Sequence, residues 1–245
     1  MNILGIDIGG SAIKAAPVNP ADGSLAVERL RIATPQPSTP EAIADALVGV
    51  IDHFNWSGPI ACGLPSVIRN GIACTAANID PAWIGVDVVA LLSRRTGLDA
   101  TVLNDADAAG LAEMHYGAGR KATGTSLVVT VGTGLGTALF RDHMLVPNTE
   151  LGHLHLHGRI AEQFASAAVR TELSLSYREW AKRFDDYLHR LEELFWPELF
   201  IIGGEISKDH AQFFPYLTIK TRILPAALRN DAGIIGAAVA FLQRG

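Results

Sequence analysis

The sequence predicts an α/β protein built from two similar halves, and three observations lead to this prediction. Short apolar runs alternate with helical patterns along the chain. Two apolar runs joined by a glycine-rich turn occur at residues 2–18 and again at 126–140. The chain has 245 residues, of which 49% are hydrophobic, enough for one large core or two smaller ones.

The first half begins with two predicted strands on either side of the segment DIGGS at residues 7–11. The segment Thr-Pro-Glu at 39–41 is a helix start, and the apolar residues that follow it fall on one helical face. Buried strands are expected at 60–64 and 101–103, with an alanine-rich helix at 106–116. Asn104 and Asp105 are therefore expected at a junction between a strand and a helix.

The second half repeats the opening pattern, since strands at 126–131 and 137–140 flank the turn GTGLG. A long helical region from 158 to 197, a strand at 199–202 and a last helix at 232–243 complete the prediction. The repeat places a boundary near residue 110. We expect a small N-terminal domain at 1–110, a larger C-terminal domain at 111–231, and a helix at about 232–245 that is a candidate addition to the first.

Charge and apolar pattern limit the classes of function. A formal net charge of −5 disfavours binding to nucleic acid or to an anionic membrane. The N-terminal segment is typical of a strand and not of a secretory signal, and the apolar runs are too short to span a bilayer, so a cytoplasmic protein is expected. Cys62 and Cys74 lie in apolar stretches and are expected to be buried, inert thiols.

The two glycine-rich turns are candidate phosphate-binding loops. Without a side chain, glycine lets backbone N–H groups approach an oxyanion closely, and Ser11, Thr133 and Lys14 add polar groups nearby. Either turn alone is more typical of a tight hairpin, and it is the occurrence of both turns that favours phosphate binding. Neither matches a Walker loop or the Rossmann fingerprint, so a nicotinamide enzyme is not indicated.

Asp105 is the candidate catalytic residue. A carboxylate at a helix N-terminus is favoured in its ionised form and can accept a hydrogen bond from a substrate hydroxyl. In phosphoryl transfer, orienting this hydroxyl matters more than removing its proton beforehand. The alternative is that Asn104 or Asp105 only caps the helix.

A polar cluster follows the second turn. Glu150, His153 and Glu162, together with His155 and His157, can exchange hydrogen bonds with the hydroxyls of a sugar. In a continuous strand the three histidines would share one face, so zinc is an alternative there.

Two further segments are weaker candidates. Asp7 could reach Mg²⁺ through water, or could simply initiate a turn. Gly203 and Gly204 follow an apolar strand and could lie against a nucleotide, although the end of a strand explains them as well.

Together these segments resemble the ROK family of sugar kinases in the actin-like ATPase superfamily, and most closely its polyphosphate glucokinase branch. The resemblance covers most of the chain. The segments that carry it are DIGGS at 7–11 with Lys14, TAANID at 75–80, LNDADAAG at 103–110, GTGLG at 132–136, PNTELGH at 147–153 and NDAGI at 230–234.

The resemblance implies two ribonuclease-H-like domains around a cleft, Mg²⁺ as the metal, and often a homodimer. It implies that Asp105 is the catalytic base, acting on the 6-hydroxyl of a hexose. The residues implied to bind the sugar are Asn78, Asn104, Asp105, Glu150, His153 and Glu162. The first phosphate loop would comprise Gly9, Gly10, Ser11 and Lys14, the second Thr133, Gly134 and Gly136, and the nucleotide would lie against Gly203 and Gly204.

The sequence departs from the family pattern twice. No cysteine occurs between Leu154 and Glu162, where many members carry a zinc motif, so no structural zinc is expected and the polyphosphate branch is favoured. Glu205 stands where the family usually has a third glycine, and its charge would repel the phosphates of ATP.

The function expected from these residues is phosphorylation of glucose, with mannose as a second substrate, by inorganic polyphosphate, ATP or both. The alternatives are an ATP-only hexokinase of the same family and a non-catalytic, sugar-responsive regulator. A regulator would need a DNA-binding segment, for which the strand beginning at Asn2 leaves no room. A chaperone-like or filament-forming relative of actin is also disfavoured, because such proteins are longer than this chain. Candidate contacts for polyphosphate are Arg69, Arg120, Lys121 and Arg141.

Overall fold

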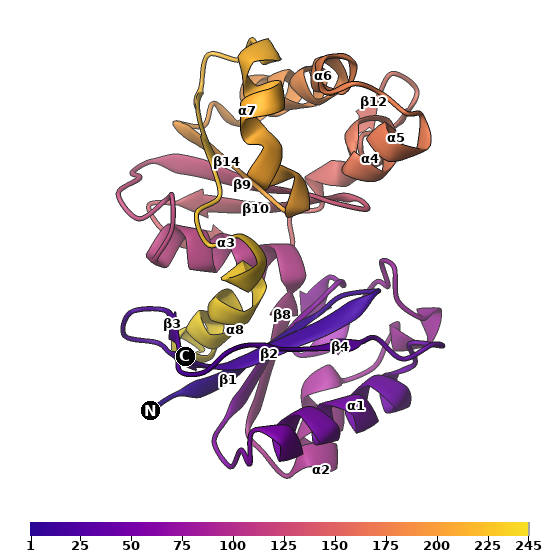
Figure 1. The fold of residues 1–245 in the computed structure, drawn as a ribbon, viewed down its shortest axis with the longest axis vertical. Coiled ribbons are helices and arrows are strands. Elements are labelled where there is room, and N and C mark those ends of the chain that lie inside the picture. The colour runs from indigo at the N-terminus through magenta and orange to yellow at the C-terminus, as the bar shows by residue number, and fades with distance from the viewer. Residues whose placement is uncertain (245) are drawn as a thin grey trace. The chain divides into compact units, whose positions relative to one another are not determined.

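The computed structural model describes residues 1–244 as helices and strands that alternate along the chain (Figure 1). The chain divides into two compact units. One comprises Met1–Ala112 together with the chain from Asp231 onward, and the other comprises Glu113–Asn230. Each unit contains one main mixed sheet with helices, so the predicted α/β class is confirmed.

The main sheet of the first unit has the strand order β3-β2-β1-β5-β8, with β4 paired to β2. β1 and β2 form the predicted hairpin, whereas β1, β5 and β8 run parallel to one another. The bounds are β1 Ile3–Ile8, β2 Ala12–Asn19, β3 Ser24–Leu25, β4 Leu30–Ala33, β5 Ile60–Leu64 and β8 Ala100–Asn104. The short strands β6 Ile68–Arg69 and β7 Ile72–Ala73 form a separate pair.

Helices cover both faces of this sheet (Figure 1). α1 (Pro40–His53) begins where the sequence predicts, because the Thr39 side chain accepts a hydrogen bond from the Ala42 N–H at 3.3 Å. α2 (Val88–Thr96) packs beside α1, while α8 (Ala232–Gln243) packs on β1 and β5. α3 (Asp105–His115) follows β8 directly, and η1 (Pro81–Trp83) is a single 3₁₀ turn.

The main sheet of the second unit has the order β11-β10-β9-β14-β15. β9 and β10 form the second predicted hairpin, with Val131 opposite Leu135, and β14 runs parallel to both β9 and β15. Both main sheets therefore combine an antiparallel hairpin with parallel strands. The bounds are β9 Thr125–Val131, β10 Leu135–Arg141, β11 Met144–Val146, β14 Leu199–Gly203 and β15 Arg222–Pro225.

The single long helical region predicted at 158–197 is wrong. A two-stranded hairpin, β12 (His155–Leu156) with β13 (Arg159–Ile160), leads into three helices: α4 Glu162–Ala165, α5 Ala167–Glu172 and α6 Tyr177–Phe195. The side chains of Ser166 and Ser176 accept backbone hydrogen bonds and cap the starts of α5 and α6. Serine at a helix start competes with continuation of the preceding helix, which explains the breaks.

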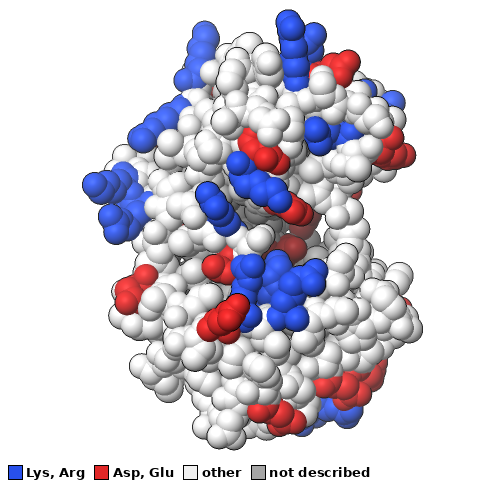
Figure 2. Space-filling model, viewed as in Figure 1, with Lys and Arg blue, Asp and Glu red and all other residues white. Residues whose placement is uncertain are grey.

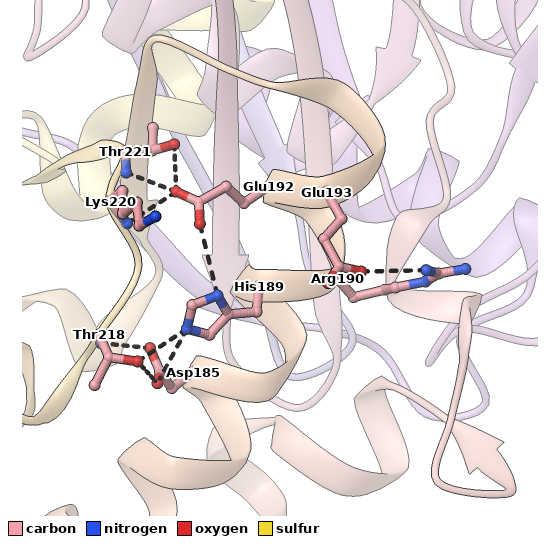
Figure 3. Close-up of polar contacts among 8 residues, drawn as sticks. All are labelled: Asp185, His189, Arg190, Glu192, Glu193, Thr218, Lys220 and Thr221. Carbon is pink, nitrogen blue, oxygen red and sulfur yellow. Dashed lines mark hydrogen bonds and ion pairs between the residues drawn. The ribbon is translucent and has the colours of Figure 1, made fainter.

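α6 packs an apolar face into the unit and is tied by its polar face to residues 218–221 (Figure 3). Asp185 accepts hydrogen bonds from the Thr218 N–H and hydroxyl, each at 2.7 Å, and Glu192 accepts from the Thr221 N–H at 2.6 Å. His189 lies between the two carboxylates, 3.6 Å from each. The segment before β15 is therefore held against α6. α7 (His210–Phe213) and the 3₁₀ turns η3 (Glu205–Asp209), η4 (Phe214–Tyr216) and η5 (Arg229–Asp231) complete the chain.

The two cysteines differ in environment. Cys62 is buried in β5, and burial raises the pKa of its thiol to about 12. Cys74 is exposed, so the prediction of a buried thiol is wrong there. It follows β7, which ends at Ala73, and lies in a surface loop.

Basic and acidic side chains are interspersed over much of the face in Figure 2. Within residues 1–244, no helix is long and apolar enough to cross a membrane.

Candidate functional site

In the first unit the predicted site residues gather at one edge of the sheet. β1, β5 and β8 run parallel, so their carboxyl ends share this edge. Asp7 lies near the end of β1, Asn104 ends β8, and Asp105 begins α3. Ligands of open α/β sheets bind at the carboxyl ends of parallel strands.

The first glycine-rich turn presents unused backbone donors at this edge. Within residues 1–244, no group accepts a hydrogen bond from the N–H of Gly10 or Ser11. The carbonyl of Gly10 accepts a bond from Gln36, and the carbonyl of Gly9 accepts one from Thr34. The turn is thus anchored through its acceptors and leaves donors for an anion.

Asn78 lies directly against this turn. A Cβ atom at Gly10 would be 2.5 Å from the carbonyl oxygen of Asn78, so only glycine allows this approach. Asn78 itself has a φ of 60° and is exposed. The loop it occupies is fixed by the Ser66 hydroxyl, which donates to the carbonyl of Thr75 at 2.7 Å.

Lys14 and Asp7 form an ion pair beside the turn. Lys14 Nζ lies 2.9 Å from Asp7 Oδ2, and both side chains are mostly buried, with exposures of 26% and 18%. The charge of Lys14 therefore partly neutralises Asp7, so neither acts as an isolated charge. Within residues 1–244, no group of three or more histidine, cysteine, aspartate or glutamate side chains could hold a metal ion.

Asn104 and Asp105 have different roles at the start of α3. Asn104 Oδ1 accepts hydrogen bonds from the N–H groups of Ala106 and Asp107, at 2.9 and 3.1 Å, and its amide donates to the carbonyl of Ser66. Asn104 thus caps the helix, as the alternative in the sequence analysis stated, and the residue is 7% exposed. Asp105 is half-buried, and its Oδ1 accepts from the Ala106 N–H at 2.8 Å. Its carboxylate is therefore oriented by the helix backbone.

In the second unit, the glycine-rich turn at 132–136 and the pair Gly203-Gly204 also lie at the carboxyl ends of parallel strands. The parallel strands β9 and β14 end at Val131, directly before Gly132, and at Gly203, respectively. Gly204 has a φ of +79°, which favours glycine and carries the chain away from the strand. Thr133 is exposed at the tip of the turn. The two segments lie side by side because their strands are neighbours.

The polar cluster adjoins this turn. His153 Nδ1 lies 4.0 Å from Glu150 Oε2, and His153 Nε2 lies 3.8 Å from Glu162 Oε1. A Cβ atom at Gly134 would be 2.5 Å from Glu162 Oε2. Residues suited to sugar hydroxyls therefore lie beside a turn suited to phosphate.

Burial perturbs one member of the cluster. The pKa of Glu150 is raised above its ordinary value, mainly by burial and further by the negative charge of Glu162, while His153 opposes the shift. Glu150 thus takes up a proton more readily than an exposed glutamate.

Thr137, Thr149 and Gly152 hold the cluster in place, and of the three only Thr137 lies outside the segments that the sequence analysis singled out. The Thr137 hydroxyl donates to the Thr149 carbonyl and accepts from the Leu151 N–H at 3.1 Å. Gly152 packs on β10 so closely that a Cβ atom would lie 2.1 Å from the carbonyl oxygen of Leu135. Thr137 belongs to no such segment, so only the folded chain identifies its role.

The shared histidine face predicted for a continuous strand is wrong. His153 ends the 3₁₀ turn η2 (Leu151–His153), and β12 contains only His155 and Leu156. His157 has a φ of 52° and pairs with Asp186 of α6 at 3.1 Å. The turn and the short hairpin break the alternation, so the three imidazoles do not line one strand face.

Glu205 has a partner at the start of η3. Lys208 Nζ lies 2.8 Å from Glu205 Oε1, and the Glu205 side chain is 79% exposed. Its charge is consequently offset by a lysine and screened by solvent.

Comparisons with known proteins identify the family of the chain. The ROK family matches residues 3–169 of the chain. Polyphosphate glucokinase of Mycobacterium tuberculosis (strain CDC 1551 / Oshkosh) is 44% identical over 97% of this chain and 90% of its own. The structure of inorganic polyphosphate/ATP-glucomannokinase from Arthrobacter sp. strain KM is 45% identical, with a TM-score of 0.96 over 100% of this chain and 99% of its own. A ROK family glucokinase from Streptomyces griseus, solved with glucose and AMPPNP, is 25% identical with a TM-score of 0.83, covering both chains fully.

Proposed function

Because the chain belongs to the ROK family, we propose that it transfers a phosphoryl group from inorganic polyphosphate or ATP to the 6-hydroxyl of glucose. The names of the Mycobacterium and Arthrobacter relatives support glucose as acceptor and polyphosphate as donor. The Arthrobacter name also supports mannose as a second acceptor and ATP as a second donor.

The observation that carries this proposal is the contact between the polar cluster and the second turn. Glu162 lies against Gly134, while His153 lies close to both Glu150 and Glu162. A sugar kinase must hold dense hydroxyl groups next to a phosphate, and this edge offers groups for both. We propose that Glu150, His153 and Glu162 bind the sugar, with Asn78 and Asn104 as further contacts.

In this proposal Asp105 acts on the reacting hydroxyl. Its carboxylate accepts the hydrogen bond of the 6-hydroxyl and takes its proton as the bond to phosphorus forms. The helix N-terminus and the Ala106 N–H favour the ionised carboxylate that this step needs. The turn N–H groups of Gly10 and Ser11 would bind phosphate oxygens.

The remaining phosphate contacts follow from the same edges. Lys14 adds a positive charge beside the first turn. Gly9 completes that turn, and the second phosphate loop comprises Thr133, Gly134 and Gly136. Gly203 and Gly204 are proposed to lie against the nucleotide when ATP is the donor. Since Lys208 offsets the charge of Glu205, repulsion of ATP by that residue is expected to be weak.

Near the first turn, Asp7 is the residue that fits a role in holding Mg²⁺. Mg²⁺ usually keeps several waters and is held by one or two carboxylates together with substrate phosphates. Asp7 supplies one such carboxylate beside the turn, so it would hold the ion through water. Bound Mg²⁺ would neutralise charge that develops on the phosphate oxygens. Homodimeric assembly and a cytoplasmic location stay predictions.

The test is formation of sugar 6-phosphate with glucose or mannose, each supplied with ATP or with long-chain polyphosphate. Asp105→Asn should lower kcat by about 10²- to 10⁴-fold, the usual contribution of a general base, and leave the Kd of glucose within about threefold. Asp52→Asn, an exposed change on α1, is the matched control and should leave kcat unchanged.

Three outcomes would contradict the proposal. Full activity of Asp105→Asn would remove this residue from catalysis, and loss of glucose binding would make it a sugar ligand instead. Glucose binding by the unmodified protein without turnover of any donor would favour a non-catalytic regulator.

A further inference from the structure

A pocket of about 430 Å³ in the second unit lies at the edge of the sheet opposite the second turn. It is lined by the loop at 117–123 and by the first residues of two parallel strands, Leu199 of β14 and Arg222 of β15. β9 separates this edge from Gly132, and its seven residues span roughly 20 Å at about 3.3 Å per residue. The pocket is therefore separate from the site proposed above.

Three cations line the pocket. Arg120, Lys121 and Arg222 are exposed, and within residues 1–244 none of them has a carboxylate partner. Glu198 is the one acidic residue of the lining, and its carboxylate accepts a hydrogen bond from the Thr125 N–H. The local charge is thus positive, although the whole chain carries a net charge of −5.

The loop that carries two of these cations is fixed by hydrogen bonds. The buried carboxylate of Glu113 accepts from the Ala118 N–H at 2.9 Å, and its backbone carbonyl accepts from the Gly119 N–H. A ring nitrogen of His143 lies 2.9 Å from the Ala122 carbonyl oxygen. Figure 2 shows a group of basic side chains at the left margin of the view. The cations therefore project from an ordered frame.

The chemistry of the lining selects phosphate groups. The guanidinium forks of two arginines match phosphate oxygens, and a lysine adds a point charge. The pocket volume of about 430 Å³ lies within the range of small-ligand pockets, about 300–1,000 Å³. A donor that is a chain of phosphates could bind here with units remote from the reacting end.

We propose that Arg120, Lys121 and Arg222 form a second phosphate-binding site, which holds a distal part of a condensed phosphate chain. The choice of ligand rests on the proposed function, in which polyphosphate is a donor. A chain bound at two places gains affinity through effective concentration, so long chains should bind more tightly than short ones. Of the four cations suggested by the sequence, Arg141 pairs with Asp142 instead and Arg69 lies in the first unit.

The experiment compares Arg120→Ala/Lys121→Ala/Arg222→Ala with Arg94→Ala/Arg178→Ala/Lys182→Ala, which removes three exposed cations outside the pocket. Donors are ATP, tripolyphosphate and long-chain polyphosphate. In the pocket variant the KM for long chains should rise about tenfold, as expected for three exposed charge contacts, while kcat and KM with ATP stay within about twofold. The control variant should retain the chain-length preference of the unmodified protein.

A direct titration without glucose makes the test independent of turnover. Long-chain polyphosphate, tripolyphosphate, orthophosphate and glucose 6-phosphate are each titrated into the unmodified protein and both variants. If the unmodified protein and the control variant bind long chains more tightly than short ones, and the pocket variant does not, the site is supported. This result would support the site even if the protein phosphorylates glucose with ATP alone. Equal binding of long chains by both variants overturns it. A pocket that binds orthophosphate or glucose 6-phosphate as tightly as long chains would be a site for a free phosphorylated metabolite, which also overturns the proposal.

Discussion

Replacement of Gly152 by alanine tests whether the placement of the polar cluster controls glucose use. Gly152 is buried in η2, between Glu150 and His153. An added Cβ atom would lie 2.1 Å from the Leu135 carbonyl oxygen, whereas ordinary contact begins at 3.4 Å. The difference, 1.3 Å, is the distance by which one of the two segments must move.

The segment at 150–153 is the one expected to move. β10 is held by hydrogen bonds to β9 on one side and β11 on the other, and Leu135 is paired with Val131. Glu150 and His153 would then shift by about 1 Å, a displacement that can cost a site about 10²-fold in rate. We expect kcat/KM for glucose to fall by about this factor. The free energy of unfolding should fall by about 1–3 kcal/mol, as for other overpacked sites.

The assay measures kcat and KM for glucose at saturating donor, together with unfolding in denaturant. Gly49→Ala on α1 is the matched control, because nothing lies within 4 Å of its added Cβ atom and the site is exposed. It should leave the kinetics unchanged. Wild-type kcat/KM and stability in Gly152→Ala would refute the reasoning, because they would mean that the contact with β10 does not position the cluster.

Two further predictions concern pH and packing. The pKa of Glu150 lies above its ordinary value of 4.5, and its ionised form is the one that accepts sugar hydroxyls, so KM for glucose should rise as pH falls through this raised pKa. In Glu162→Gln, which removes the neighbouring negative charge, the rise in KM should begin at lower pH. In Glu150→Gln the rise should disappear. If both variants keep the pH dependence of the unmodified protein, its assignment to Glu150 is contradicted. Gly236→Ala should lower the free energy of unfolding by about 3 kcal/mol or more, because its Cβ atom would lie 1.6 Å from the Ala108 carbonyl oxygen, whereas Gly49→Ala should raise it by about 0.5–1 kcal/mol. Denaturant unfolding of both variants checks this, and a neutral Gly236→Ala would refute the close packing of α8 on α3.

Local patterns allowed much of the fold to be predicted. The hairpins around the two glycine turns, the start of α1 at Thr39 and the helix α8 all depend on neighbours within a few residues. The breaks between the helices in the region 158–197 were not predicted, because residues of high helix propensity continue through it. Ser166 and Ser176 interrupt it by capping new helices, a choice that depends on the packing of each short helix.

The sequence by itself determined the candidate residues and their local settings, such as Asp105 at the junction of a strand and a helix. Only the tertiary structure decided which of them meet. Glu162 reaches Gly134 across 28 residues of chain, and Arg222 joins Arg120 at a common pocket, because parallel strands bring distant segments to one edge. The tertiary structure also decides the raised pKa of Glu150, because the main cause of the shift is burial of its carboxyl group. Contacts and burial of this kind are set by strand order, which no local pattern encodes.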